Sequence, residues 1–284
     1  MHFRVGRFEL VFLDGGRFWL DGGGMFGIVP RTLWGKQYPP DEANRVQIFC
    51  RALLIRTPDR CALVDPGLGA NWEGKWNEIL KITPGNIKAE LERHGLKPAD
   101  IQTCVFTHLH FDHAGGALDK IYGQWVPAFP KADFVVQKDE FEHALRPGAR
   151  DRASYRVVDI LPLAHSGRVK LVEGDVELFP GLKVVRVGGH SPGLQVVVVE
   201  SEGMRAYYLS DLAPFLAHLR PTWLAAYDLD PSAVLREKQR LLAEAEESRS
   251  LILLGHEPLH PSGVPKRDAQ GALFLEKPKE YEHA

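Results

Sequence analysis

Hydrophobic and polar positions repeat along the chain with two different periods. Runs rich in β-branched and aromatic residues predict strands, and they cover residues 46–56, 61–64, 101–106, 133–137, 169–172, 183–187, 194–200, 205–209 and 250–254. Apolar residues three and four positions apart predict helices, at residues 84–94, 138–145 and 231–248. The tripeptide Glu202-Gly203-Met204 predicts a hairpin turn. The stretch 146–164, rich in Arg, Pro and Asp, predicts a helical insertion or a flap.

The order of these elements predicts the fold class. Strands come first, helices next and polar, chemistry-bearing residues after them, and the second half repeats this order without clear sequence similarity to the first. No linker or low-complexity segment divides the chain. We therefore predict one α/β domain over residues 1–284, with two packed sheets and helices outside them.

Charge and composition narrow the choice of partners. The 284 residues carry 35 basic and 37 acidic side chains, for a formal net charge of −2. This balance does not favour nucleic acid or an anionic membrane surface as a partner. The apolar run from Phe8 to Asp14 is interrupted by Glu9 and is a poor signal-peptide core. We expect a cytoplasmic monomer or homodimer that acts on a small molecule, with Cys50, Cys61 and Cys104 as reduced, largely buried thiols.

The strongest chemical signal follows the predicted strand 101–106. His108, His110, Asp112 and His113 lie within six residues, and Gly115-Gly116 come directly after them. In an extended segment, residues two apart project to one side, so His108, His110 and Asp112 would point together. His113 would then turn the other way. One loop can thus offer ligands to two neighbouring metal ions.

Three more residues of strong ligand type occur at the ends of predicted strands. His190 follows the strand 183–187, Asp211 follows 205–209 and His256 follows 250–254. A lone residue of this kind is usually a structural polar group. Together with the first cluster, these three supply what two metal ions need beyond one loop. His143, His165, His218 and His260 are expected to lie outside the metal site.

These motifs resemble the signature segments of the metallo-β-lactamase superfamily. The segments are Val64-Asp65-Pro66-Gly67, residues 107–116, Gly189-His190-Ser191-Pro192-Gly193, Ser210-Asp211 and Gly255-His256. The resemblance spans roughly residues 45 to 260 and implies a four-layer αββα sandwich with the site at one edge. It also implies ligand roles, which place His108, His110 and His190 on the first metal, Asp112, His113 and His256 on the second, and Asp211 between the two. Asp65 would support the site without being a ligand.

The chemistry of this ligand set agrees with a hydrolase. Imidazole and carboxylate suit zinc, with manganese, iron or cobalt as alternatives, and no cysteine belongs to the set. Two cations bridged by a carboxylate lower the pKa of a water molecule between them and provide a hydroxide nucleophile. Asp112 and Asp211 are the carboxylates expected to serve catalysis directly.

The resemblance extends to one branch of the superfamily, which contains N-acyl homoserine lactonases and organophosphate (methyl parathion) hydrolases. The stretch 20–34 resembles a segment that walls the substrate pocket in that branch. We predict an apolar cleft lined by Phe26, Trp34, Phe111 and Phe215, with ordinary core packing as the alternative. The resembled lactonases have a tyrosine three residues after the bridging aspartate, where this chain has Pro214. Whether Tyr227 replaces it stays open.

The predicted reaction is hydrolysis of a lactone, an ester or a phosphotriester. A diiron oxidoreductase on the same ligands is the main alternative, although no room for a flavin domain follows His256. A persulfide dioxygenase would use a single iron, and the full second set of ligands argues against it. A nuclease would need a basic face, and a non-enzymatic scaffold would not need all seven ligands.

Overall fold

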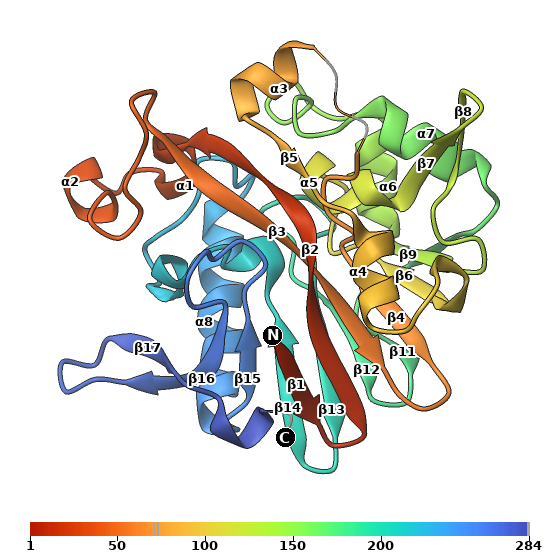
Figure 1. Ribbon diagram of the computed structural model, residues 1–284. Helices are drawn as coiled ribbons and strands as arrows, with labels where there is room; N and C mark the ends of the chain where they lie inside the picture. Colours follow the sequence, from red (N-terminus) through yellow and green to blue (C-terminus); the bar gives the residue numbers. More distant parts are fainter. Residues whose placement is uncertain (71, 73, 283–284) are drawn as a thin grey trace.

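The computed structural model (Figure 1) describes residues 1–70, 72 and 74–282, whose strands form two large sheets and one separate hairpin. The first sheet contains, in order, β1 (His2–Val5), β2 (Phe8–Asp21), β3 (Arg45–Arg56), β4 (Cys61–Val64), β6 (Thr103–Val105), β9 (Asp133–Gln137) and β10 (Val169–Val172), with β5 (Thr83–Pro84) paired to β2. The second contains β11 (Val176–Phe179), β12 (Leu182–Arg186), β13 (Gln195–Ser201), β14 (Met204–Tyr208), β15 (Leu251–Leu253), β16 (Ser262–Arg267) and β17 (Leu273–Glu276). The hairpin is β7 (Leu118–Ile121) with β8 (Gln124–Pro127). Each sheet therefore comes from one half of the chain.

Helices cover the outer faces of both sheets. These outer helices are α4 (Ile87–Arg93), α6 (Lys138–Leu145), α7 (Val157–His165) and α8 (Pro231–Glu247). The shorter helices are α1 (Gly22–Phe26), α2 (Arg31–Trp34), α3 (Lys75–Leu80) and α5 (Phe111–Ala114), and α5 carries two of the predicted ligands. Leu91 of α4 and Leu163 of α7 pack on the first sheet, whereas Val234 and Leu241 of α8 pack on the second. Figure 1 shows α8 and the helices α4 to α7 on opposite sides of the strands.

The main core lies between the two sheets. Val64 and Val105 of the first sheet share one buried cluster with Val197, Tyr208 and Leu253 of the second. Helix, sheet, sheet and helix thus follow each other as four layers, and the predicted αββα sandwich is confirmed. Within residues 1–70, 72 and 74–282, no helix has the length and apolar character needed to cross a bilayer.

The predicted elements agree with the structure where the hydrophobic pattern is regular. The helix predicted at 138–145 has the same bounds as α6, and the turn at Glu202 and Gly203 connects β13 to β14 with positive φ angles of 54° and 76°. Part of the stretch 146–164 forms α7. The long strand β2 was not predicted, because Asp14-Gly15-Gly16 interrupts its pattern where the register with β3 shifts. The last hairpin, β16 with β17, was not predicted either.

Strand direction explains where the site forms. β4, β6 and β9 run parallel to one another, and β14 runs parallel to β15 in the other sheet. The carboxyl ends of parallel strands meet at one edge of a sheet, so the loops that follow them gather there. The motifs after β4, β6, β14 and β15 are therefore brought together at one edge of the sandwich.

Candidate metal centre

The loop after β6 carries four of the predicted ligands in two different conformations. His108 and His110 lie in extended chain, and α5 begins immediately after them at Phe111. Asp112 and His113 therefore belong to a helical turn. The expectation that Asp112 points together with His108 and His110 is wrong for this reason, because alternation of side chains stops where the helix begins.

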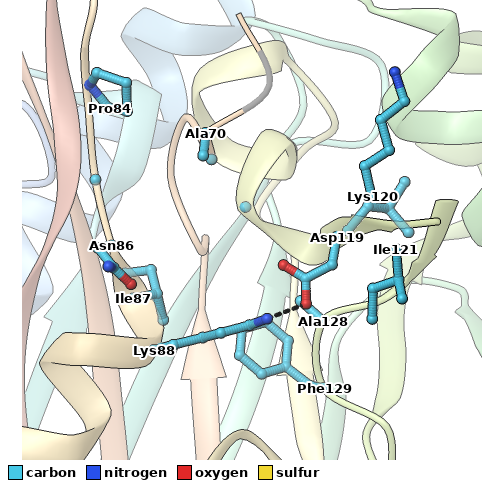
Figure 2. Close-up of a pocket in the computed structure, with 14 residues that line it drawn as sticks. Ala70, Pro84, Asn86, Ile87, Lys88, Asp119, Lys120, Ile121, Ala128 and Phe129 are labelled. Carbon is cyan, nitrogen blue, oxygen red and sulfur yellow. Dashed lines mark ion pairs between the residues drawn. The ribbon is translucent and has the colours of Figure 1, made fainter. Parts of the chain in front are cut away.

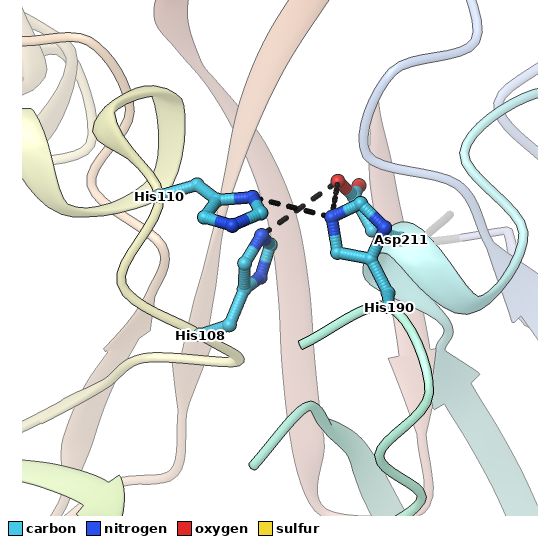
Figure 3. Close-up of side chains that lie close together, drawn as sticks. All are labelled: His108, His110, His190 and Asp211. Atoms are coloured by element: carbon cyan, nitrogen blue, oxygen red, sulfur yellow. Dashed lines mark hydrogen bonds and ion pairs between the residues drawn. The ribbon is translucent and has the colours of Figure 1, made fainter. Parts of the chain in front are cut away.

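A first group of side chains combines His108, His110, His190 and Asp211 (Figure 3). One ligand atom from each lies within 4.8 Å of all the others. Nε2 of His190 is 3.1 Å from Oδ2 of Asp211 and 3.2 Å from Nδ1 of His110. Nε2 of His108 is 3.7 Å from the same Asp211 oxygen. This is the set that the resemblance implied for the first metal, together with the bridging carboxylate.

A second group lies on the other side of Asp211. Oδ1 of Asp211 is 2.8 Å from Nε2 of His256 and 3.7 Å from Nε2 of His113, and these two nitrogens are 3.2 Å apart. Oδ2 of Asp112 is 3.5 Å from Nε2 of His113 and 3.6 Å from Nε2 of His256. The two carboxylate oxygens of Asp211 thus face different groups of histidines, and all seven predicted ligands converge.

The hydrogen bonds of the histidines fit metal binding. Nδ1 of His113 lies 2.8 Å from Asp65, Nδ1 of His190 lies 2.9 Å from Asp228, and Nδ1 of His256 lies 2.6 Å from the carbonyl of Phe49. An acceptor at Nδ1 holds the ring proton there, which leaves a lone pair on Nε2 directed at the cluster. Nε2 of His108 is fully buried and has no hydrogen-bond partner among the described residues. Two cations would satisfy these inward-facing atoms.

Comparison with known proteins agrees with this geometry. Residues 46–256 match the family model of the metallo-beta-lactamase superfamily. The match covers well over half of the chain. This chain belongs to the metallo-β-lactamase superfamily.

Three relatives place it more narrowly within the superfamily. An N-acyl homoserine lactonase from Bacillus thuringiensis is 28% identical over 260 residues, which cover 88% of this chain and 93% of the relative. A probable metal-dependent hydrolase from Staphylococcus aureus is 32% identical, with a TM-score of 0.88 over 96% of this chain and 98% of that one. An N-acyl homoserine lactone hydrolase, whose structure holds N-hexanoyl-L-homoserine at its catalytic metal centre, is 27% identical, with a TM-score of 0.68 over 89% and 94% of the two chains.

Two supporting residues of this superfamily member adopt an unusual backbone conformation. Asp65 and Ser210 have φ angles of 47° and 48°, a region that side chains other than glycine rarely occupy. Asp65 accepts hydrogen bonds from the amide and the hydroxyl of Thr107 as well as from His113. Thr107 lies 2.7 Å from the Ser210 hydroxyl and 3.2 Å from Nδ1 of His108. Strain at these positions is retained because the network holds ligands from both sheets.

A close approach of backbone explains the glycine before His190. Gly189 has a φ angle of 87°, and an added Cβ would lie 2.7 Å from a methyl carbon of Val234 and 2.8 Å from its backbone nitrogen. Only glycine fits between the His190 loop and the start of α8. This contact fixes the direction from which His190 enters the site.

Charges inside the site divide the histidines into two classes. Burial lowers the pKa of His108 and His110, and neighbouring histidines lower it further. Burial also opposes protonation of His190, but the carboxylates of Asp211 and Asp228 outweigh it and raise its pKa to about 10. The pKa values of His113 and His256 are raised as well, against burial, by the aspartates that face them. The aspartates therefore favour positive charge at these three rings, which bound cations would also supply.

Three residues that contact the candidate site or its neighbours were not indicated by the sequence. Asp228 orients His190 but stands in a stretch without a motif, so no sequence signal indicated it. Glu257 directly follows His256, and its carboxylate accepts hydrogen bonds from the Tyr38 hydroxyl and the Leu216 amide. The third is Cys50, whose Sγ lies within 4.8 Å of ligand atoms of Asp112 and His256. Nothing in the sequence indicated that this thiol lies so close to the predicted ligands.

The predicted pocket residues do not share one environment. Phe26, Trp34 and Phe215 are buried in one aromatic cluster, where the ring of Phe26 stacks on the other two at centroid distances of 5.1 and 5.6 Å. Their burial favours the alternative of core packing. Phe111 is only partly buried and contacts Phe18 and Trp72 edge-on. A role in substrate binding stays a prediction for all four.

The remaining histidines named above take no part in these ligand groups of the described chain. Nε2 of His143 lies 2.6 Å from Asp151, and Nε2 of His218 lies 2.9 Å from the carbonyl of Met25. Burial lowers the pKa of His218 to about 3, so this ring is neutral. The hydroxyl of Tyr227 lies over Gly24 in α1.

A separate groove of about 500 Å³ lies behind the metal loop (Figure 2). It is lined by Gly116 at the end of the metal motif, by the start of α4 and by β7. An ion pair between Lys88 and Asp119 crosses it. None of the seven metal-ligand candidates lines this groove.

Proposed function

We propose that this chain is a dinuclear metal-dependent hydrolase that opens lactone rings. That it is a metal-dependent hydrolase of the metallo-β-lactamase superfamily follows from its family and relatives. The single observation that supports two metals is Asp211, whose two oxygens face two separate histidine groups. The lactone is proposed because the relatives matched over most of the chain act on N-acyl homoserine lactones.

The residues of the site have separate tasks in this proposal. Two divalent ions, most consistent with zinc, would when bound lower the pKa of a water molecule between them and polarise the ester carbonyl. His108, His110 and His190 would hold the first ion, and Asp112, His113 and His256 the second. Asp211 would fix the separation of the ions. Asp65, Asp228 and the Phe49 carbonyl keep the three rings oriented through Nδ1.

The position of the missing tyrosine bears on substrate choice. Pro214 is buried beside Ala213 and offers no hydroxyl. Tyr155 lies against His110 with a ring distance of 4.8 Å, but its hydroxyl donates to Glu140 at 3.0 Å. The proton of the Tyr155 hydroxyl is therefore used in a hydrogen bond to the buried carboxylate of Glu140. Activity toward homoserine lactones is accordingly proposed without assistance from Tyr155.

The test is a substrate panel measured together with metal content. Purified protein reconstituted with zinc, manganese, cobalt or iron is assayed on N-acyl homoserine lactones of several chain lengths, aryl esters and phosphotriesters. We expect about two ions per chain and fastest turnover of lactones, with Asp211→Ala as the inactive control. Preference for phosphotriesters would contradict the lactone assignment. Iron-dependent visible absorption that responds to redox agents, without hydrolysis, would instead favour a diiron oxidoreductase.

A further inference from the structure

Cys50 of β3 lies beside the second group of ligands rather than in the general core. Its side chain is only 3% exposed. Its Sγ, a carboxylate oxygen of Asp112 and a ring nitrogen of His256 all lie within 4.8 Å of one another. Zinc bonds to sulfur, nitrogen and oxygen are about 2.0–2.3 Å long, so one ion can reach all three atoms after a small movement.

Backbone pairing holds the thiol in this place. The amides of Phe49 and Arg51 donate to the carbonyls of His256 and Gly255, at 3.4 and 3.1 Å. The ring of His256 donates back to the carbonyl of Phe49. Cys50 is therefore held between two anchor points on the loop that carries His256. Because side chains alternate along a strand, Cys50 projects to the buried face, opposite to Phe49 and Arg51.

Asp112 is the carboxylate that lies next to the thiol in this group. The residue is only 8% exposed. The nearest nitrogens, from His113 and His256, lie at 3.5 and 3.6 Å. A largely buried carboxylate is costly unless positive charge compensates it, either from these rings or from a cation. The carboxylate and the thiol lie close to the same point.

We propose that Sγ of Cys50 is a further ligand of the second metal, together with Asp112, His113, His256 and Asp211. This inference rests on the two-metal site proposed above. On binding, the S–H bond breaks, the proton leaves to water and a sulfur–metal bond forms. Thiolate ligands favour zinc, cadmium and cobalt(II) over manganese and magnesium. The second metal position would thus discriminate more strongly between metal ions than the first.

Cobalt(II) separates this inference from the two-metal proposal itself. Metal-free protein is titrated with cobalt, and visible d–d bands report binding to the nitrogen and oxygen ligands. A near-ultraviolet charge-transfer band reports a bond from thiolate to cobalt. Variants Cys50→Ser and Cys50→Ala are compared with Cys104→Ala. Cys104 is the matched control, because it is also fully buried but packs in the core between the first sheet and its helices.

We expect the charge-transfer band in the wild type and in Cys104→Ala, and its complete loss in both Cys50 variants. The second cobalt should bind about ten- to a hundredfold more weakly in those variants. Visible bands without a charge-transfer band in the wild type would overturn the Cys50 assignment and leave the two-metal proposal intact. A charge-transfer band that persists in Cys50→Ser would overturn it too. Absence of both kinds of band would overturn the two-metal proposal, and with it the role of Cys50. The wild-type spectrum decides even if a variant does not fold.

Discussion

The two halves of the chain contribute to the metal centre in opposite ways. The first half contributes four candidate ligands from residues 108–113, within one loop and one helical turn. The second half contributes the candidates His190, Asp211 and His256, each after a different strand of the second sheet. Local chain geometry brings the first set together, and Asp65 and Ser210 then support it through Thr107 and His113. The second set depends on correct packing of the two sheets, so the halves should respond differently to mutation.

The largest difference between the two halves is expected from mutation of Asp211 in the second half and Asp112 in the first. Asp211→Ala should lower kcat/KM by at least about a thousandfold and reduce the content of both metals, because each ion loses a ligand. Asp112→Ala should lower the content of the second metal and leave the first in place. Kinetics and metal analysis on the same samples check this. Asp211→Asn should be nearly as damaging as alanine. Wild-type activity of either Asp211 variant would remove this residue from the site.

Two phenylalanines beside these aspartates provide the next contrast. Phe215→Ala removes a fully buried ring from the aromatic cluster, and we expect a loss of roughly 3–5 kcal/mol in the free energy of unfolding. Phe111→Ala removes a partly buried ring and should cost roughly 1–2 kcal/mol. Denaturant titration measures both.

Relative rates on lactones of different chain length complete that experiment. A change in chain-length preference with Phe111→Ala alone would identify this ring as a pocket wall. Equal losses of stability, with every substrate slowed alike, would make both rings core residues and remove Phe111 from the pocket.

The supporting carboxylates allow a milder comparison of the two metals. Asp228→Asn weakens the acceptor behind His190, so the first metal should bind about ten- to a hundredfold more weakly. Asp65→Asn should do the same to the second metal through His113. Competition with a chelator measures each affinity. If both variants weakened the same ion, the assignment of the rings to two separate metals would be wrong.

The smallest expected effect is a dependence on pH. His190 has a pKa raised to about 10 in the metal-free protein, above its ordinary 6.5. Its proton therefore stabilises the folded metal-free protein fully below pH 6.5, and this stabilisation is lost as the pH rises toward 10. Metal binding becomes stronger over the same range, because fewer protons compete.

The difference in Tm between zinc-loaded and chelator-treated protein should consequently widen from pH 6.5 to 9. Each kcal/mol corresponds to about 2–4 °C for a chain of this size. His165→Asn, at an exposed position outside the site, should show the same widening as the wild type. A constant difference in Tm would mean that the histidines hold no protons when the metals are absent.

Local patterns in the sequence were the most informative. The motif at 108–113 lies in a few consecutive residues, and the regular apolar pattern of 138–145 predicted α6 with its exact bounds. His190, Asp211 and His256 were found because each follows a regular strand. Their convergence and the αββα layers depended on the resemblance to a known family, because spacing along the chain does not show how two sheets pack.

What was missed has a common physical cause. Asp228 and Cys50 lie next to residues that are far away in the sequence, at His190 and at His256. Neither has a pattern of its own, and a single cysteine in an apolar strand is usually a buried thiol. The side chain of Asp112 was predicted to point with those of His108 and His110, which is wrong because Asp112 lies in a helix. This helix has only four residues, too few to give a helical pattern of apolar positions in the sequence. Strand β2 escaped prediction because its bulge breaks the alternation.

The hydrogen bond from His256 to the carbonyl of Phe49 has a consequence for how this enzyme can diversify. The rings of His113 and His190 are held by aspartate side chains, so point mutations at Asp65 or Asp228 can adjust their basicity. His256 is held by the main chain, which every residue at position 49 supplies equally. A single mutation at Asp65 or Asp228 can therefore change how the ring of His113 or His190 is held. Mutation of Phe49 leaves the backbone acceptor of His256 in place.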